Sequence, residues 1–188
     1  MKRAIPFTLC LITAATIPTL SHASSVAVGY ETLDVSGVSL SGLTVSGSLD
    51  LTENLYLSAG TGTVSKTISG LKVELDATSV GLGFKTGISE TVDIYGAISS
   101  VNQKLTASWS GYTASADGSS TVYGAGLKVA LSDKVDGTIG IVKSTESGSS
   151  MTTTLGLEVE VMDNIDLTVS TSNNDVVDSV AIGMQYNF

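Results

Sequence analysis

The sequence predicts an all-β protein in which ten antiparallel strands close into an up-and-down barrel that spans a membrane. Apolar residues alternate with small or polar residues over most of residues 24–188, and this period of two is typical of strands with one apolar face. A short turn pattern recurs along the same region, and the chain ends on a strictly alternating strand. No run of about 18 apolar residues follows the N-terminal segment, so we expect no membrane-spanning helix.

The recurring pattern is an apolar residue, three turn-forming residues and a second apolar residue. It occurs at 51–55, 88–92, 131–135 and 161–165. A three-residue hairpin loop places its flanking residues opposite each other on one face of the sheet, and the strands on both sides keep their apolar residues on that face. Four hairpins give eight strands. An opening strand from Val26 and a closing strand from Val180 bring the predicted number to ten.

The predicted strands cover most of the chain. They run over 25–33, 39–51, 55–64, 71–86, 92–103, 119–131, 135–145, 150–161, 165–173 and 177–188. The apolar phase reverses near Gly42 and near Thr78. A β-bulge, or a strand end that stands clear of the membrane, would explain each reversal.

The N-terminal residues have the pattern of a secretory signal peptide. Lys2 and Arg3 form a short cationic region, residues 4–20 are mostly apolar, and Ser21 and Ala23 are small residues where signal peptidase reads them. We therefore expect a signal peptide at 1–23 and a single barrel domain at 24–188.

Removal of residues 1–23 changes the chemistry available to the protein. Cys10, His22, Arg3 and both prolines are lost with this segment, and seven lysines remain against 18 acidic residues, which gives a formal net charge of −11. Such a charge disfavours nucleic-acid binding. Without Cys or His, residues 24–188 offer no thiolate or imidazole for a zinc site or a catalytic dyad. We expect no enzyme activity, no cofactor and no metal.

The last strand carries the most specific motif of the chain. Gly183, Tyr186 and Phe188 match the closing-strand assembly signal of bacterial outer-membrane β-barrels, with glycine at the third place of the final octet and aromatics at its sixth and last places. Residues 24–188 thus resemble the small, porin-like outer-membrane barrels of Gram-negative bacteria. A soluble sandwich that buries the apolar face between two sheets is the alternative.

The resemblance implies a location and an orientation. The protein would lie in the cell outer membrane, with the membrane lipids and the barrel assembly machinery as partners, and with both termini and the short turns in the periplasm. The segments expected outside are 34–38, 65–70, 104–118, 146–149 and 174–176.

One of these outer segments holds candidate binding residues. Trp109 and Tyr112 lie in 104–118, the longest predicted loop. An exposed Trp and Tyr can anchor a binding partner. Alternatively, both rings rest on the barrel rim at the membrane interface, where such residues are favoured.

The face opposite the apolar one is small and polar, and its charged residues gather near the periplasmic turns. This predicted lumen mouth comprises Asp50, Lys85, Asp93, Lys128, Asp136, Glu160 and Asp166. A ring of carboxylates would attract cations, whereas lysines that neutralise the acids would form a salt-bridged plug.

Three classes of function follow from the sequence. A barrel of about eight strands is filled by side chains and a wide channel needs about 16, so ten strands fit a narrow passive channel. The carboxylates of the predicted mouth would make this channel prefer cations. A surface-recognition or adhesin-like barrel and a secreted structural β-protein are the alternatives. The sequence identifies no solute, ligand or oligomeric state.

Overall fold

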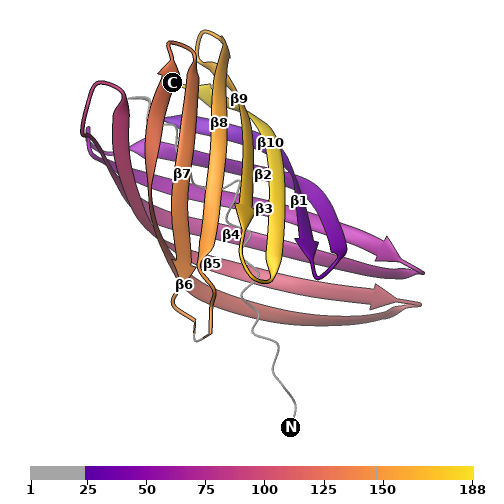
Figure 1. Ribbon diagram of the computed structural model, residues 1–188. Coiled ribbons are helices and arrows are strands. Elements are labelled where there is room, and N and C mark those ends of the chain that lie inside the picture. Colours follow the sequence, from indigo (N-terminus) through magenta and orange to yellow (C-terminus); the bar gives the residue numbers. More distant parts are fainter. Residues whose placement is uncertain (1–23, 147) are drawn as a thin grey trace.

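The computed structural model describes residues 24–146 and 148–188, and these form ten antiparallel strands closed into one barrel (Figure 1). Each strand pairs with the next, and β1 pairs with β10 to close the ring. The strands are β1 Ser25–Val35, β2 Val38–Asp50, β3 Leu55–Ile68, β4 Leu71–Gly87, β5 Val92–Trp109, β6 Tyr112–Ser132, β7 Val135–Ser144, β8 Thr152–Met162, β9 Ile165–Asn173 and β10 Val177–Asn187. The predicted fold class and strand number are confirmed. The predicted signal peptide at 1–23 lies outside the described residues.

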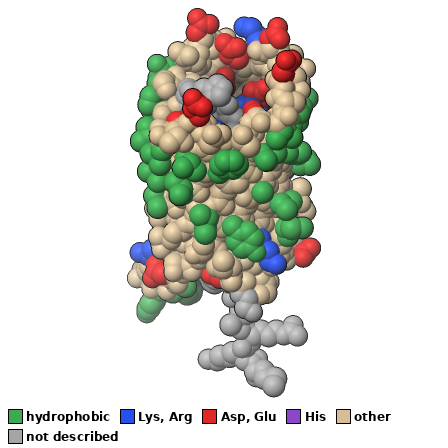
Figure 2. All heavy atoms as spheres, turned by 90° about the vertical axis from the view of Figure 1, so that its left-hand side faces the viewer, with side chains coloured by type: hydrophobic (Ala, Val, Ile, Leu, Met, Phe, Trp, Pro, Cys, Tyr) green, Lys and Arg blue, Asp and Glu red, His purple; other side chains and the backbone are tan. Residues whose placement is uncertain are grey.

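The two faces of the barrel wall have opposite chemistry. Large apolar side chains point outward and are exposed, among them Val45, Leu57, Leu82, Ile98, Ile139, Leu157, Val169 and Ile182. Figure 2 shows such side chains on the wall between two ends that carry charged side chains. A sandwich would bury this face, so the exposed apolar wall excludes it and fits a surface covered by lipid. The described residues contain no helix that is long and apolar enough to cross a membrane.

The four predicted turns join the strands at one end of the barrel. The amide of Leu51 donates to the carbonyl of Leu55 (2.8 Å), and the amide of Ile88 donates to the carbonyl of Val92 (2.9 Å). At the other two turns a register shift places Ser132 opposite Val135, and Met162 opposite Ile165. Leu131 and Val161 therefore occupy bulges there and do not face the predicted partners.

Three hairpins at the opposite end close through Ser-Gly pairs. Both residues have positive φ at 36–37 (53° and 83°), 69–70 (49° and 86°) and 110–111 (48° and 86°). Positive φ at both central residues defines the type I′ turn, whose twist matches that of the paired strands, and glycine adopts this conformation without strain.

The predicted loop at 104–118 is wrong. β5 continues to Trp109 and β6 begins at Tyr112, and the two strands pair without interruption from Val92↔Val129 to Trp109↔Tyr112. The segment is rich in Ser, Ala and Gly, which resembles a loop in composition. Its backbone groups are nevertheless satisfied by a regular ladder, so the short side chains do not prevent a strand.

The lengthened hairpins β3–β4 and β5–β6 project beyond the rest of the barrel as a four-stranded sheet (Figure 1). We call residues 63–76 and 104–117 the extension. Its base is the row Thr63, Asp76, Lys104 and Asp117, which are paired across the four strands. At about 3.3 Å per residue, the extension rises about 20 Å along its strands from that row.

The apolar phase reverses without a β-bulge. Pairing is regular through Gly42 and through Thr78. On β4, Leu82 points outward, whereas Leu75 is buried on the inner face. The reversal therefore marks the level at which the outer wall becomes polar, which fits a strand end that stands clear of the membrane.

Candidate functional site: the lumen and its two ends

The predicted lumen-mouth residues all lie on the inner face, near the end of the barrel that holds the four short turns. The structure joins several of them as ion pairs. Lys85 Nζ lies 2.7 Å from Asp50 Oδ2, across the intervening strand β3. Lys128 Nζ lies 3.0 Å from Asp136 Oδ2 and 2.7 Å from Glu158 Oε2. Each lysine is therefore neutralised locally by carboxylates on other strands of the barrel.

The other three predicted carboxylates form no ion pair with Lys85 or Lys128. Asp166 accepts a hydrogen bond from the Asn187 side-chain amide at 2.7 Å. Asp93 and Glu160 form no salt bridge with any residue in 24–146 or 148–188. The mouth thus combines salt-bridged lysines with an excess of acid, so elements of both predicted alternatives are present.

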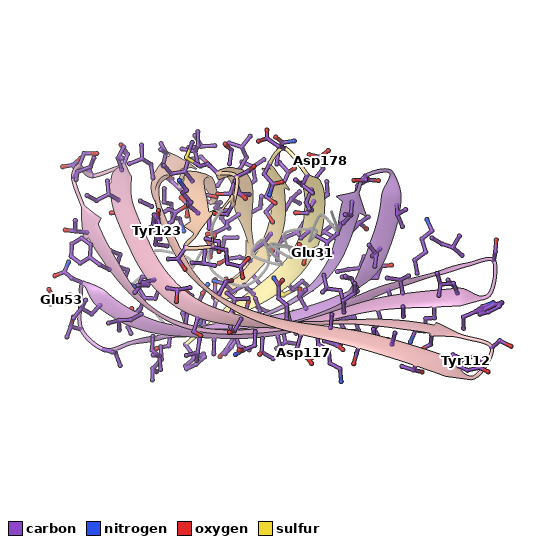
Figure 3. All side chains as sticks on the ribbon, turned by 90° about the horizontal axis from the view of Figure 1, so that it is seen from below. Glu31, Glu53, Tyr112, Asp117, Tyr123 and Asp178 are labelled. Atoms are coloured by element: carbon purple, nitrogen blue, oxygen red, sulfur yellow. The ribbon has the colours of Figure 1, made fainter. Side chains whose placement is uncertain are left out.

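Sequence reasoning missed two inward carboxylates. Glu158 occupies the inner phase of β8 between Gly156 and Glu160. Glu31 occupies the inner phase of β1, next to Leu33. The signal was available, since the period of two that placed Glu160 inside also places Glu158 there. Figure 3, viewed from the end that carries the extension, shows Glu31 within the ring of strands.

Two tyrosines narrow the lumen beside the mouth. Tyr56 and Tyr95 lie on the inner faces of β3 and β5 and are almost fully buried. A Cβ at Gly83 would lie 1.9 Å from Tyr56 Cζ, and one at Gly126 would lie 2.3 Å from the Tyr95 hydroxyl oxygen. These glycines therefore make room for tyrosine rings that lie against the wall, in addition to lining the lumen as the sequence suggested.

A cavity of about 70 Å³ lies within the barrel beside β1, β2 and β7 to β10. Its polar lining includes Thr44, Thr138, Glu158, Ser170 and Gln185. Lys128 bonds Glu158 from β6, so the cavity borders the charged mouth. This part of the interior is polar and leaves room for water.

The interior is apolar toward the opposite end. We call the cluster Leu33, Leu40, Val64, Leu75, Ala77 and Val177 the apolar belt. It crosses the neighbouring strands β10, β1, β2, β3 and β4, and Leu105 of β5 packs against it. The lumen therefore has a charged end and an apolar end.

The predicted assembly residues lie at the seam where the barrel closes. The amide of Phe188 donates to the carbonyl of Ser24 at 2.8 Å. Tyr186 and Phe188 point outward, and their rings stack with centroids 6.2 Å apart. A Cβ at Gly183 would lie 2.8 Å from the carbonyl oxygen of Val28 on β1, so only glycine fits without displacement. Recognition of these residues by an assembly machinery stays a prediction.

Trp109 and Tyr112 are paired at the tip of the extension, on either side of the turn at 110–111. Figure 3 shows Tyr112 at this tip. Their side chains are 59% and 78% exposed. The interpretation that they rest on the barrel rim is wrong, because the strands continue past the rim and carry both rings away from the apolar wall. Their role as binding anchors stays a prediction.

No protein-family model and no curated protein sequence match this chain. Solved structures do match. The translocator domain of the autotransporter NalP from Neisseria meningitidis superposes with a TM-score of 0.52 at 17% identity, covering 90% of this chain and 91% of that one. The KdgM porin in complex with disordered oligogalacturonate gives a TM-score of 0.52 at 11% identity, covering 87% and 99%.

The chain has the fold of outer-membrane β-barrels. This confirms the resemblance that the closing strand indicated, and it supports the predicted outer-membrane location. The attachment invasion locus protein Ail of Yersinia pestis also matches, with a TM-score of 0.45 at 18% identity, covering 89% of this chain and 99% of Ail. At these identities the likeness concerns the fold and does not transfer a ligand or an activity.

Proposed function

We propose that this outer-membrane barrel is a narrow passive channel that prefers small cations. The observation that supports this proposal is the excess of carboxylates at the charged mouth. Both inner lysines of the mouth are engaged by Asp50, Asp136 and Glu158, while Asp93, Glu160 and Asp166 lie at the same end and form no ion pair within residues 24–146 and 148–188. Uncompensated carboxylates around a low-dielectric opening raise the local concentration of cations. The proposed partners are the outer-membrane lipids and the barrel assembly machinery.

The same arrangement favours a narrow rather than a wide conductor. Tyr56 and Tyr95 occupy inner wall space, and the ion pairs of Lys85 and Lys128 cross the lumen surface near the mouth. Ten strands enclose less space than the 16 or so of general porins. We therefore expect a small conductance.

Selectivity in planar bilayers tests the proposal. The triple variant Asp93→Asn, Glu160→Gln and Asp166→Asn removes charge while conserving side-chain size. We expect the reversal potential in a KCl gradient to move toward zero, because fewer carboxylates attract K⁺ at the mouth. The preference of the unmodified protein should also decrease as salt concentration rises and screening shortens the reach of the carboxylates.

Exposed acids on the short turns provide the matched control. Glu53→Gln, Glu90→Gln and Asp163→Asn remove the same formal charge outside the lumen, so the reversal potential should change much less. A folded barrel that carries no current at any salt concentration would contradict the channel. An equal shift in both triple variants would contradict the role of the mouth.

Surface recognition is the second candidate function. The extension favours it, since it holds Trp109 and Tyr112 exposed at its tip. Binding of the protein to a surface partner that is lost on Trp109→Ser would support this candidate.

A further inference from the structure

One edge of the extension is a strand that has a neighbour on one side only. β6 pairs with β5 as far as its first residue, Tyr112, whereas its pairing with β7 begins only at Val122. On the β7 side, residues 112–120 have no paired strand within the part of the chain that the structure describes, and we call them the free edge. Figure 1 shows the β5–β6 hairpin projecting away from β7. At about 3.3 Å per residue, the free edge is about 30 Å long.

The pairing on both sides of β6 determines which backbone groups point out of the free edge. The amide of Ala130 donates to the carbonyl of Thr91 on the β5 side, and the carbonyl of Thr121 accepts from the amide of Thr145 on the β7 side. Successive residues of a strand direct their N–H and C=O groups to alternate sides. Even-numbered residues of the free edge therefore bond to β5. The residues that direct both backbone groups away from β5 are Thr113, Ser115, Asp117 and Ser119.

The free edge lacks features that usually protect an exposed strand from pairing. Natural edge strands are commonly blocked by proline, by lysine or by a β-bulge. Residues 112–120 contain no proline and no lysine, and their pairing with β5 is regular. The opposite edge of the extension is shorter, since β3 continues past its pairing with β2 only over 66–68, and it carries Lys66 there. The β6 edge is therefore open to a partner.

An extended polypeptide backbone is the complement of this edge. The residues that point out of it recur at every second position, about 7 Å apart, and each offers one donor and one acceptor. A partner strand presents acceptors and donors at the same spacing, which is the basis of recognition by strand addition. A small ligand does not match the full length of the free edge.

The two faces beside the free edge select the side chains of the partner. On the inner face Ala114, Ala116 and Gly118 are small, and Ala116 lies opposite Leu105 of β5. A long apolar side chain of an added strand can therefore pass over these residues toward Leu105. On the outward face Asp117 is exposed, and its carboxylate favours a basic side chain on the added strand.

We infer that the free edge of β6 binds an extended peptide segment by β-strand addition. The favoured segment alternates apolar residues, which lie on the inner face of the extension, with polar or basic residues on the outward face. The inference goes beyond the proposed channel and does not require the lumen to conduct. A second copy of this chain is the competing occupant, and the experiment distinguishes it.

The single tryptophan of the sequence reports on peptide binding, since Trp109 lies opposite Tyr112 at the start of the free edge. The probe is a short synthetic peptide that alternates valine with threonine and lysine, added to the purified barrel in detergent. We expect a saturable change in fluorescence and, with isotope-labelled peptide carbonyls, an infrared amide band typical of a strand. The same peptide with proline at its central positions should bind at least about tenfold more weakly, because proline cannot complete the ladder.

Two substitutions at one position isolate the contribution of the backbone. Ser115→Pro removes an N–H group that points out of the free edge and leaves the bonds to β5 in place, whereas Ser115→Ala removes only the hydroxyl group. We expect Ser115→Pro to weaken binding of the valine peptide at least about tenfold, because a peptide carbonyl loses its donor. Ser115→Ala should bind the peptide as the unmodified protein does. Retention of the folded, faster-migrating form on unheated gels verifies that each variant is a closed barrel.

Three outcomes would overturn the inference. Equal binding of the valine and proline peptides by the unmodified protein would do so without any reliance on the folding of a variant. Equal binding by Ser115→Pro and Ser115→Ala would mean that the peptide adsorbs without using the edge. Dimers of the purified barrel that Ser115→Pro dissociates would assign the edge to a second copy of the chain. Current in planar bilayers is measured separately, so the channel and the peptide site can fail independently.

Discussion

Replacing Tyr186 and Phe188 together with Ser should nearly abolish insertion into the outer membrane. Both rings point outward at the end of β10, stacked beside the seam where the amide of Phe188 reaches Ser24. The change removes the aromatic part of the closing-strand motif and apolar area that faces lipid. Membrane fractionation and the proportion of heat-modifiable protein measure the effect.

The control for this experiment lies on the same strand and the same face. Ile182→Ser with Met184→Ser removes exposed apolar side chains outside the aromatic positions. We expect this variant to be less stable but still inserted. Unchanged outer-membrane levels of the Tyr186 and Phe188 variant would contradict the assembly role. Equal loss of insertion in both variants would mean that the aromatic residues contribute only through their contact with lipid.

Neighbouring positions on β9 should respond very differently to arginine. Val169 is 43% exposed on the outer wall, midway along the strand, whereas Ser170 points inward and lines the cavity that also contains Glu158. Val169→Arg places a charge against lipid and should cost about 2–4 kcal/mol of folding free energy near the bilayer midplane. Ser170→Arg places its charge in a polar space near a carboxylate, so we expect a much smaller loss.

Reversible unfolding in lipid vesicles compares the two arginine variants at the same depth. Equal destabilisation would mean that the assignment of inner and outer faces is wrong. A larger loss for Ser170→Arg would mean that the lumen is too tightly filled to accept a long side chain, which would also count against conduction.

The strands could be predicted from the sequence because the two faces of the barrel wall have different environments, lipid on the outside and a polar interior on the inside. Each residue of the wall faces either lipid or the interior, so apolar and polar residues alternate through strands such as β8 and β10. This alternation identifies each strand in the sequence. Turn positions at 51–55 and 88–92 were also predictable, since turn-forming residues interrupt the pattern there. The inward position of Asp50, Lys128 and Asp136 followed from the same phase.

Features that depend on pairing between distant segments were not predicted. The segment 104–118 has a loop-like composition, and only its register with β4 and β6 makes it a strand. The Ser-Gly pairs at 69–70 and 110–111 were an overlooked signal for tight turns.

Contacts across the interior also escaped prediction. The Tyr95 side chain lies against Gly126 and Gly140 on the next two strands. The need for glycine at these two positions becomes visible only when the pairing of the three strands is known. The ion pair of Lys128 with Glu158 likewise spans two strand pairings.

Labelling of single cysteines in intact cells tests most directly that the protein spans the outer membrane with the extension outside. The only Cys of the sequence, Cys10, lies in the predicted signal peptide, so an introduced Cys would be the sole target in the processed protein. Ser110→Cys marks the tip of the extension and Asp163→Cys marks a short turn at the opposite end. With a membrane-impermeant maleimide, we expect Ser110→Cys to be labelled in intact cells and Asp163→Cys only after the outer membrane is permeabilised. Labelling of Asp163→Cys but not Ser110→Cys in intact cells, or of neither before lysis, would contradict the account.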